Sequence, residues 1–373
     1  MKKLNKLKVR EELKTLDKVS YASEHIDLPE GGVDCYEGCN PYGFPPELVE
    51  AVREFDLNRL GPYPHSTAIF DGLKEYFKGQ VFLEPENLMI TDGSISALYT
   101  INNLFDKGAR VLGIMPQFSD QEANLKLNGM IYEAVPMKRE DNYKINTQEI
   151  LNRIDTDGDE LSMIYIDNPN NPTGQVINCD VIEQIIKKAE PFGIAVVLDE
   201  AYGDLMANEN SAIKYLEKYE NLIMVRTMSK GFGLAGLRIG YIIAAKPVIA
   251  CLRKLRNPYM VNEFARELAG AALLHSHHIW SNIADFAIQK REIRSVIGHN
   301  LKMAETCDTV SLCVLYHKDR SVDLKQMFYD RGVLCVSGED FNGLDSSFVR
   351  IRLPKIDEFP KLFEAVKDID RPE

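Results

Sequence analysis

One lysine in this chain lies among groups that could activate it and that could also bind an anion. Lys230 follows the hydroxyl of Ser229 and precedes a glycine-rich turn, and Arg238 comes eight residues later. A lysine amine whose pKa is lowered by burial or by neighbouring cations becomes a nucleophile that condenses with an aldehyde. A hydroxyl, main-chain N–H groups and a guanidinium are donors that suit a phosphate. The segment therefore indicates a Schiff-base lysine beside a phosphate site. The simpler alternative is a surface lysine in a loop.

The glycines of this segment also fit a dinucleotide fingerprint. Gly231, Gly233 and Gly236 have the spacing G-x-G-x-x-G. That fingerprint requires a helix that opens on the glycines and an acidic residue about twenty positions later. Residues 253–256 read Arg-Lys-Leu-Arg near that distance and offer no carboxylate. The sequence therefore argues against a nicotinamide cofactor.

Further upstream, a carboxylate ends an apolar run. Residues 195–198 are Ala-Val-Val-Leu, Asp199 follows them, and Tyr202 comes three positions later. Short apolar runs are typical of parallel strands buried on both faces, and open α/β sheets bind ligands at the carboxyl ends of such strands. Pyridoxal phosphate carries both an aldehyde and a phosphate, and its ring contains a pyridinium nitrogen. A carboxylate at the end of such a strand can keep that nitrogen protonated, which makes the ring an electron sink. The alternative role of Asp199 is to cap the next helix.

A second apolar run, residues 164–166, leads into a turn that is dense in asparagine, proline and glycine over residues 168–174. The amide of Asn171 in this turn could donate a hydrogen bond to the ring hydroxyl oxygen of the cofactor. By itself the segment predicts no more than a turn.

Together and in this order, the three motifs resemble those of the class I/II aminotransferases, which are pyridoxal-phosphate enzymes of fold type I. The resemblance covers most of the chain, with 28 residues from Asn171 to Asp199 and 31 from Asp199 to Lys230. It implies that Lys230 carries the cofactor as a Schiff base (an aldimine) and that Asp199 pairs with the pyridinium nitrogen. It also implies that Tyr202 and Asn171 approach the ring hydroxyl. Lys230, Asp199 and Tyr202 are then the expected catalytic residues.

The resemblance further assigns the phosphate contacts and a residue that stacks on the ring. Ser229 and Arg238 hold the phosphate. The sequence around Ser94 reads as a strand, a turn and a helix, and the N–H groups of a helix N-terminus bind anions, so Ser94 and Ile95 are also expected there. Phe118 is the candidate for ring stacking, and a core phenylalanine is the alternative for it.

Further segments point to one branch of the family. Residues 37–45 and 341–351 are similar to segments that histidinol-phosphate aminotransferases and threonine-phosphate decarboxylases share. The resemblance assigns the substrate carboxylate to Arg350, a bidentate contact that lysine makes poorly. Strand alternation puts Arg352 on the same face as Arg350, so spacing alone leaves both open and the resemblance selects Arg350. A solvated arginine on an edge strand is the alternative for either residue.

Two positions depart from that branch. Its members usually carry an arginine four residues after the glycine of the preceding strand, where this chain has Val336 after Gly332. Without that guanidinium a substrate phosphate loses a charge-assisted, bidentate contact. Gly38, which we expect to contact the substrate together with Asn171, stands where the relatives often have asparagine. Both departures argue against a phosphorylated substrate, and the sequence does not identify the amino acid.

We therefore expect a pyridoxal-phosphate-dependent aminotransferase that moves an amino group between an amino acid and a 2-keto acid. The alternative within the family is a decarboxylase of an amino acid or phospho-amino acid, because the orientation of the substrate decides which bond breaks. A non-catalytic cofactor-binding or regulatory domain is the alternative from another class. The intact lysine, aspartate and arginine set argues against that alternative. The resemblance also implies a homodimer in which Tyr63 reaches the phosphate of the partner site.

The length and pattern of the chain predict an α/β protein of two domains. The chain of 373 residues is too long for one small hydrophobic core, and short apolar runs alternate with helical stretches. We expect a three-layer α/β/α large domain with a mostly parallel sheet over residues 41–256 and a smaller α+β domain over residues 257–373. Residues 1–40 should form an N-terminal arm and a segment that packs with the small domain.

Two finer structural expectations accompany this division. Leucines at positions 4, 7, 13 and 16 indicate an amphipathic helical arm over residues 1–18. Within the small domain, short strands are expected at residues 309–315 and 332–337.

Composition argues against several classes of partner. The net charge of −12 and the pI of about 5.2 disfavour nucleic-acid binding. No run approaches the ~18 apolar residues of a membrane span, and no signal peptide follows the first methionine. Seven cysteines without a C-x-x-C pair suit the cytoplasm better than a disulfide framework or a zinc site. His275, His277 and His278 form the one histidine cluster. We expect no metal there, because no cysteine or carboxylate lies nearby at ligand spacing.

Overall fold

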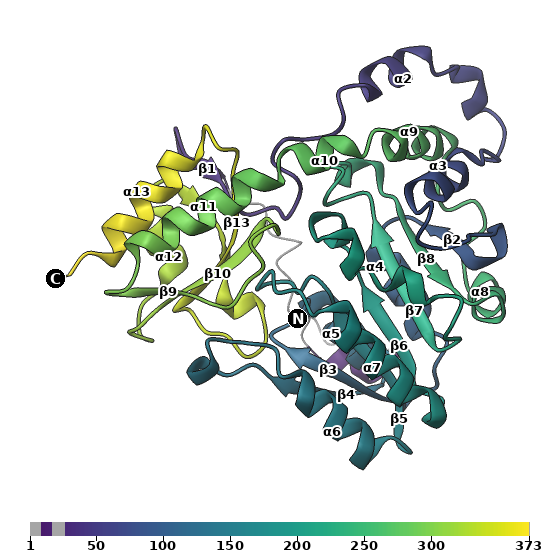
Figure 1. The fold of residues 1–373 in the computed structure, drawn as a ribbon, viewed down its shortest axis with the longest axis horizontal. Coiled ribbons are helices and arrows are strands. Elements are labelled where there is room, and N and C mark those ends of the chain that lie inside the picture. The colour runs from purple at the N-terminus through teal and green to yellow at the C-terminus, as the bar shows by residue number, and fades with distance from the viewer. Residues whose placement is uncertain (1–8, 17–26, 373) are drawn as a thin grey trace.

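The computed structural model describes residues 9–16 and 27–372 and has a larger and a smaller part. Figure 1 shows the larger part built around a broad sheet and the smaller, C-terminal part beside it. Helices α10 (His277–Ser281) and α11 (Ile283–Val296) lead from one part to the other.

Seven strands form the sheet of the larger part, in the order β2-β8-β7-β6-β5-β3-β4. Neighbouring strands from β7 to β4 pair in parallel, and β8 pairs antiparallel with both β7 and β2. The strands are β2 (Leu88–Thr91), β3 (Arg110–Met115), β4 (Ile131–Pro136), β5 (Leu161–Asp167), β6 (Ala195–Asp199), β7 (Leu222–Thr227) and β8 (Gly240–Ala244). The predicted mostly parallel sheet is confirmed.

Helices cover both faces of this sheet, because successive side chains of a strand point to opposite faces. In β5, Ile164 and Ile166 pack in one apolar cluster with helices α3, α6, α7 and α9, whereas Met163 and Tyr165 pack in another with α4, α5 and α8. These helices are α3 (Ala68–Tyr76), α4 (Ser94–Asn102), α5 (Ser119–Leu127), α6 (Thr147–Asp157), α7 (Cys179–Ala189), α8 (Lys246–Arg253) and α9 (Glu263–Leu274). The larger part is therefore a three-layer α/β/α structure, as predicted.

The parallel strands bring distant segments of the chain to one edge of the sheet. Strands β3, β5, β6 and β7 run in the same direction, so their carboxyl ends lie along the same edge. Asp167 ends β5 and Asp199 ends β6, and the two residues are paired in register. Open α/β sheets bind their ligands at this edge.

The smaller part contains a four-stranded antiparallel sheet in the order β12-β13-β10-β9. A short parallel pair, β1 with β11, ties the N-terminal segment to this part. The elements are β1 (Val33–Asp34), β9 (Leu301–Met303), β10 (Leu312–His317), β11 (Val333–Leu334), β12 (Val336–Ser337), β13 (Phe348–Arg352), α12 (Leu324–Tyr329) and α13 (Phe359–Asp370). The domain boundaries at residues 40 and 256 stay predictions.

Two strand predictions in this part need correction. The strand expected at residues 309–315 is β10, which lies two to three residues later. The strand expected at residues 332–337 is two strands in different sheets, because β11 pairs with β1 while β12 pairs with β13. The chain changes sheets at Cys335, and the local apolar pattern carries no sign of that change.

The described part of the expected N-terminal arm, residues 9–16, forms one short helix, α1 (Glu12–Thr15). Its Leu13 and the following Leu16 are 44% and 41% exposed, so they do not form a buried stripe. The other two leucines of the expected arm lie outside the described residues.

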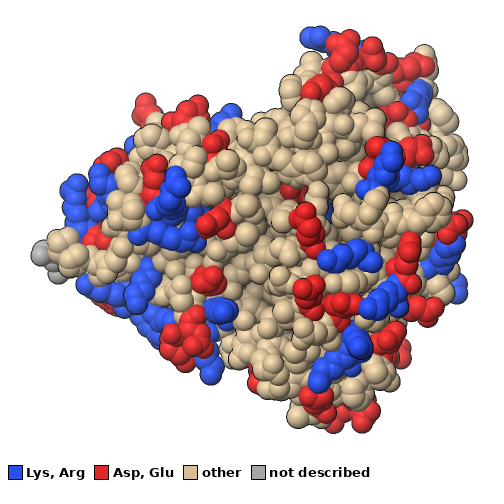
Figure 2. Space-filling view, viewed as in Figure 1, with Lys and Arg blue, Asp and Glu red and all other residues tan. Residues whose placement is uncertain are grey.

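The surface carries acidic and basic side chains mixed together over the face seen in Figure 2. Among the described residues, no helix is both long and apolar enough to cross a membrane.

Candidate active site

A cavity of about 110 Å³ lies at the carboxyl edge of the large sheet. Its lining includes nine of the residues that the sequence selected: Ser94, Ile95, Phe118, Asn171, Asp199, Tyr202, Ser229, Lys230 and Arg238. They come from the start of α4 and from the chain that follows β3, β5, β6 and β7. Segments that are far apart in the sequence therefore meet at one site.

One end of this cavity presents donors for an anion. As at every helix N-terminus, the first N–H groups of α4, which begins at Ser94, have no intrahelical partner, and the N-cap residue Gly93 has no side chain to cap them. Gly93 has a φ of +111°, and a Cβ atom there would lie 2.6 Å from Arg238 Nη2. The glycine therefore lets the guanidinium approach the helix terminus. With the Ser229 hydroxyl, these groups suit a phosphate.

Lys230 and Tyr202 lie together under the N-terminal segment. The Lys230 Nζ is 5.6 Å from the centroid of the Tyr202 ring. A Cβ atom on Gly38 would collide with the Tyr202 hydroxyl and would lie 3.5 Å from Lys230 Nζ. The main-chain N–H of Asn40 donates to the Lys230 carbonyl at 2.9 Å. In this arrangement a side chain at position 38 would have to displace the Tyr202 hydroxyl.

Asp199 is a buried carboxylate with two hydrogen-bond donors. The Ala201 N–H donates to its Oδ1 at 3.0 Å, and the Tyr165 hydroxyl donates to its Oδ2 at 3.1 Å. Burial, and after it the negative charge of Asp167, raise the pKa of Asp199 to about 7. A cation bound beside Asp199 would stabilise its ionised form. The carboxylate is therefore suited to a cationic ligand group.

Arg350 lies beside the cavity rather than in its lining. It is 1% exposed, and it donates from Nη1 to Asn171 Oδ1 at 3.2 Å and from Nη2 to the Tyr36 carbonyl. Arg352, on the same strand, instead donates to two main-chain carbonyls of the N-terminal segment, at 2.9 and 2.6 Å. Of the two arginines, only Arg350 is hydrogen-bonded to a residue of the cavity.

Tyr63 is not among the residues that line the cavity of its own chain. It is 69% exposed and stacks on Tyr259, with ring centroids 4.5 Å apart. Glu263 holds the following loop, because it accepts the main-chain N–H groups of His65 and Ser66 at 2.9 Å each. The structure thus presents Tyr63 on the surface, and its contact with a partner site stays a prediction.

An ion network fully buried in the large domain supports the segment around Lys230. Arg226 on β7 pairs with Glu200 at 2.6 Å and with Asp204 at 2.9 Å. A Cβ atom on Gly231 would lie 2.5 Å from the Asp204 Cβ, so this network packs directly against the residue after Lys230. Each charged group of the network has a partner, with the two carboxylates sharing one guanidinium, so the network fixes the base of the site.

One carboxylate of the cavity lining, Asp167, was not predicted from the sequence. It ends an apolar strand, as Asp199 does, and this was the signal that could have selected it. The adjoining turn drew attention to Asn171 instead.

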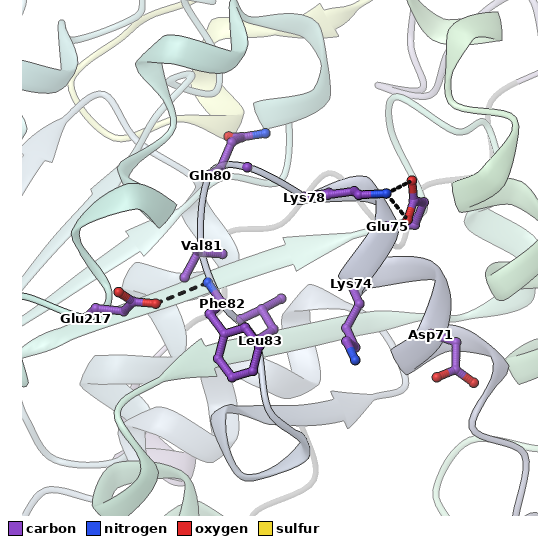
Figure 3. A pocket seen from close by; sticks show the side chains of 10 residues that line it. Asp71, Lys74, Glu75, Lys78, Gln80, Val81, Phe82, Leu83 and Glu217 are labelled. Atoms are coloured by element: carbon purple, nitrogen blue, oxygen red, sulfur yellow. Dashed lines mark hydrogen bonds and ion pairs between the residues drawn. The ribbon is translucent and has the colours of Figure 1, made fainter.

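A larger hollow, of about 680 Å³, lies on the surface beside α3 and the loop that follows it. Figure 3 shows its charged lining, in which Lys78 bonds Glu75, and Glu217 accepts the N–H of Phe82. This hollow contains none of the residues that the sequence selected. Its size therefore does not make it the candidate site.

Comparison with known proteins decides the family. The family model described as "Aminotransferase class I and II" matches residues 36–366. The chain belongs to the class I and II aminotransferases. These enzymes depend on pyridoxal phosphate, and the recognition of the family from the sequence is confirmed.

Relatives of this aminotransferase fall in the predicted branch. The chain is 33% identical over 260 residues to the histidinol-phosphate aminotransferase of Pyrococcus furiosus, and the aligned residues cover 69% of each protein. It is 28% identical over 340 residues to a Caldanaerobacter subterraneus protein provisionally named a threonine-phosphate decarboxylase, which covers 88% of each. The crystal structure of the histidinol-phosphate aminotransferase from Clostridium acetobutylicum superposes with a TM-score of 0.79 at 22% identity. That match covers 91% of this chain and 99% of that one, and it shows the shared fold.

The residues of this aminotransferase's cavity fit pyridoxal phosphate. The open N-terminus of α4 and Arg238 suit the phosphate, Lys230 suits the aldehyde, and Asp199 suits a protonated ring nitrogen. When bound, the cofactor supplies an electron sink for the electrons of a bond broken at the substrate α-carbon.

Proposed function

We propose that this aminotransferase moves the amino group of an unphosphorylated amino acid to a 2-keto acid, with Lys230 as its catalytic lysine. The observation that carries the proposal is one cavity that holds Lys230, Asp199 and a set of phosphate donors, with Arg350 beside it. Lysine supplies the covalent attachment, and arginine supplies a planar fork for a carboxylate.

Each residue of the cavity has a proposed part. Lys230 binds the cofactor and, once the substrate amine has displaced it, takes the proton from the substrate α-carbon. Asp199 holds the charge of the ring nitrogen, and Phe118 stacks on the ring. Tyr202 and Asn171 contact the ring hydroxyl.

The phosphate of the cofactor and the substrate have their own proposed contacts. Ser94, Ile95, Ser229 and Arg238 hold the phosphate, which leaves Arg350 for the carboxylate of the substrate.

The surroundings of Val336 support a substrate without phosphate. Val336 is fully buried in an apolar cluster with Tyr36, Leu334 and Phe341, opposite Arg350 on the neighbouring strand. Because Arg350 is assigned to the substrate carboxylate, a phosphate placed there would lose its water without gaining a cation of its own, which is costly.

Two other arginines could replace the missing guanidinium, and the contacts of both argue against it. Arg331 pairs with Asp368 at 2.6 Å and donates to the Met327 carbonyl at 2.8 Å. Arg352 is engaged by main-chain carbonyls of the N-terminal segment. Among the described residues we therefore assign no arginine to a substrate phosphate.

We further propose that the working unit is a homodimer in which Tyr63 serves the site of the partner subunit. Its exposure of 69% and its fixed loop support this part of the proposal. Closed two-fold dimers are the commonest oligomers.

The seven cysteines are free thiols, which supports the cytoplasm as the compartment.

The experiment that tests the proposal incubates the cofactor-loaded enzyme with each of the twenty amino acids separately. Pyridoxamine phosphate and the matching keto acid should form, in stoichiometric amounts, with at least one of them. Release of carbon dioxide without keto acid would instead support decarboxylation, the activity named for one of the relatives. Repeating the assay with phosphoserine and phosphothreonine tests the preference for unphosphorylated substrates.

A further inference from the structure

Asp167 lines the same cavity as Lys230 and Asp199, and none of the parts proposed above uses it. It is 3% exposed and is the last residue of β5, in register with Asp199 at the end of β6. Register-paired side chains of neighbouring parallel strands extend from the same face, and such strands lie ~4.8 Å apart. Two carboxylates therefore stand side by side at the edge where the cofactor binds.

The hydrogen bonds of Asp167 come from neutral groups. Its Oδ1 accepts from Asn170 Nδ2 at 2.9 Å and from Gln117 Nε2 at 3.3 Å, and its Oδ2 accepts from the main-chain N–H of Asn171 at 2.9 Å. These bonds orient the carboxylate and leave its charge intact. The bond to Asn171 also fixes the residue whose side chain meets Arg350.

Two other buried carboxylates of the large domain have a cation beside them. Glu200 and Asp204 share Arg226, at 2.6 and 2.9 Å, which offsets part of their charge. Asp167 has no such ion pair among the described residues, and burial raises its pKa to about 6. A buried charge that lacks an ion pair is costly to folding and marks a candidate functional site. The cost falls when a cation enters the cavity.

We propose that Asp167 is a positioning residue of the cofactor site, whose charge adds to that of Asp199 in holding the cationic ring nitrogen and whose hydrogen bond fixes Asn171 opposite Arg350. The proposal rests on the proposed function, because the cofactor supplies that nitrogen. Asp199 remains the direct partner of the ring. Asp167 acts through its charge and through Asn171.

Two variants separate the charge of Asp167 from its hydrogen bonds. Asp167→Asn removes the charge and nearly keeps the shape. Gln117→Met is the matched control, because it removes one hydrogen bond from Asp167, together with the bonds of Gln117 to Tyr132 and to the Tyr165 carbonyl, and keeps the charge and most of the buried volume. If Asp167→Asn does not fold, Asp167→Ser makes the same comparison.

The first readout is the visible absorbance of the cofactor-loaded enzyme across pH, which reports the pKa of the Lys230 nitrogen joined to the cofactor. Negative charge nearby favours the protonated form of that nitrogen and raises its pKa. Asp167→Asn should therefore lower this pKa, and Gln117→Met should leave it nearly unchanged.

The second readout needs no cofactor. Burial raises the pKa of Asp167 to about 6 and that of Asp199 to about 7, above the ~4 of an unfolded chain. The folded state therefore favours the protonated forms of both residues. The stability gained from this preference is complete below about pH 4 and is lost as the pH rises through 6 and 7. The melting temperature of the cofactor-free wild type should fall between about pH 4 and pH 7. It should fall less in Asp167→Asn, while Lys230 and Tyr165, the other ionisable groups that act on Asp199, are unchanged.

Two results would overturn the proposal. An absorbance pKa that shifts equally in Asp167→Asn and Gln117→Met would mean that only the hydrogen-bonded geometry matters. An absorbance pKa that shifts in neither, with the same pH dependence of melting as the wild type, would mean that the charge has no effect. Failure of the proposed function would look different, because the wild type itself would then show no lysine-bound cofactor.

Discussion

Replacing Arg350 by lysine should selectively weaken the binding of substrates that have a carboxylate. Arg350 is 1% exposed and already donates to Asn171 Oδ1 at 3.2 Å and to the Tyr36 carbonyl. A lysine ammonium keeps the charge, but it cannot serve these two acceptors and also bind a carboxylate in one plane. The loss should be at least one charged hydrogen bond, about 1.5–3 kcal/mol. That corresponds to a roughly 10- to 150-fold lower kcat/KM.

The assay measures the first half-reaction at varied concentrations of the best amino acid and of the amine that lacks its carboxylate. Arg350→Lys should reduce kcat/KM for the amino acid and change it little for the amine, so the ratio between the two substrates should fall. Arg352→Lys is the matched control, because Arg352 lies on the same strand and its partners, main-chain carbonyls and the Asp34 carboxylate, do not line the cavity. It should reduce stability without changing the ratio. An unchanged ratio in Arg350→Lys, or an equal fall in both variants, would refute the assignment.

Three other perturbations test different parts of the account. Asp199→Asn should bind the cofactor but lose activity by roughly 10- to 1,000-fold, because removing an opposite charge lowers the pKa of the ring nitrogen by about 1–3. Activity within a few-fold of wild type would contradict this. Mixing inactive Lys230→Ala subunits with weakened Tyr63→Ala subunits should restore part of the activity, and no recovery despite verified subunit exchange would count against a Tyr63 that serves the partner site. Arg226→Met should lower the free energy of unfolding in urea by about 3–5 kcal/mol, since it leaves buried carboxylates unpaired. The surface variant Lys218→Met should have little effect, and a similar loss in both would argue against a special role for the buried network.

The motifs of the large domain were predictable because they combine local structure with chemistry. Asp199 and Asn171 each follow a short apolar run, and such runs become parallel strands with their carboxyl ends at one edge. The glycine-rich turn after Lys230 could be recognised from the sequence in the same way. Once these segments are placed in one sheet, their side chains must lie close together.

Asp167 was missed because its importance depends on a neighbouring strand. Nothing in the local sequence says that β6 pairs with β5 in the register that sets Asp199 beside it. Similarly, a period of two places Arg350 and Arg352 on one face, and only the contact with Asn171, far away in the sequence, distinguishes them.

The small domain was harder to predict for the same reason. Its strands are short, and two of them, β11 and β12, follow each other but pair with different partners. Those partners, β1 and β13, come from opposite ends of the chain. The sequence of any one of these segments gives little indication of the distant segment with which it pairs.

The attachment of the cofactor to Lys230 is the central claim, and borohydride reduction tests it most directly. The enzyme loaded with pyridoxal phosphate is reduced, digested and mapped by mass spectrometry, with Lys230→Ala as the control. We expect the reduced cofactor on the peptide that contains Lys230, and no labelled peptide from the variant. A label on any other lysine, or equal labelling of wild type and Lys230→Ala, would contradict the account.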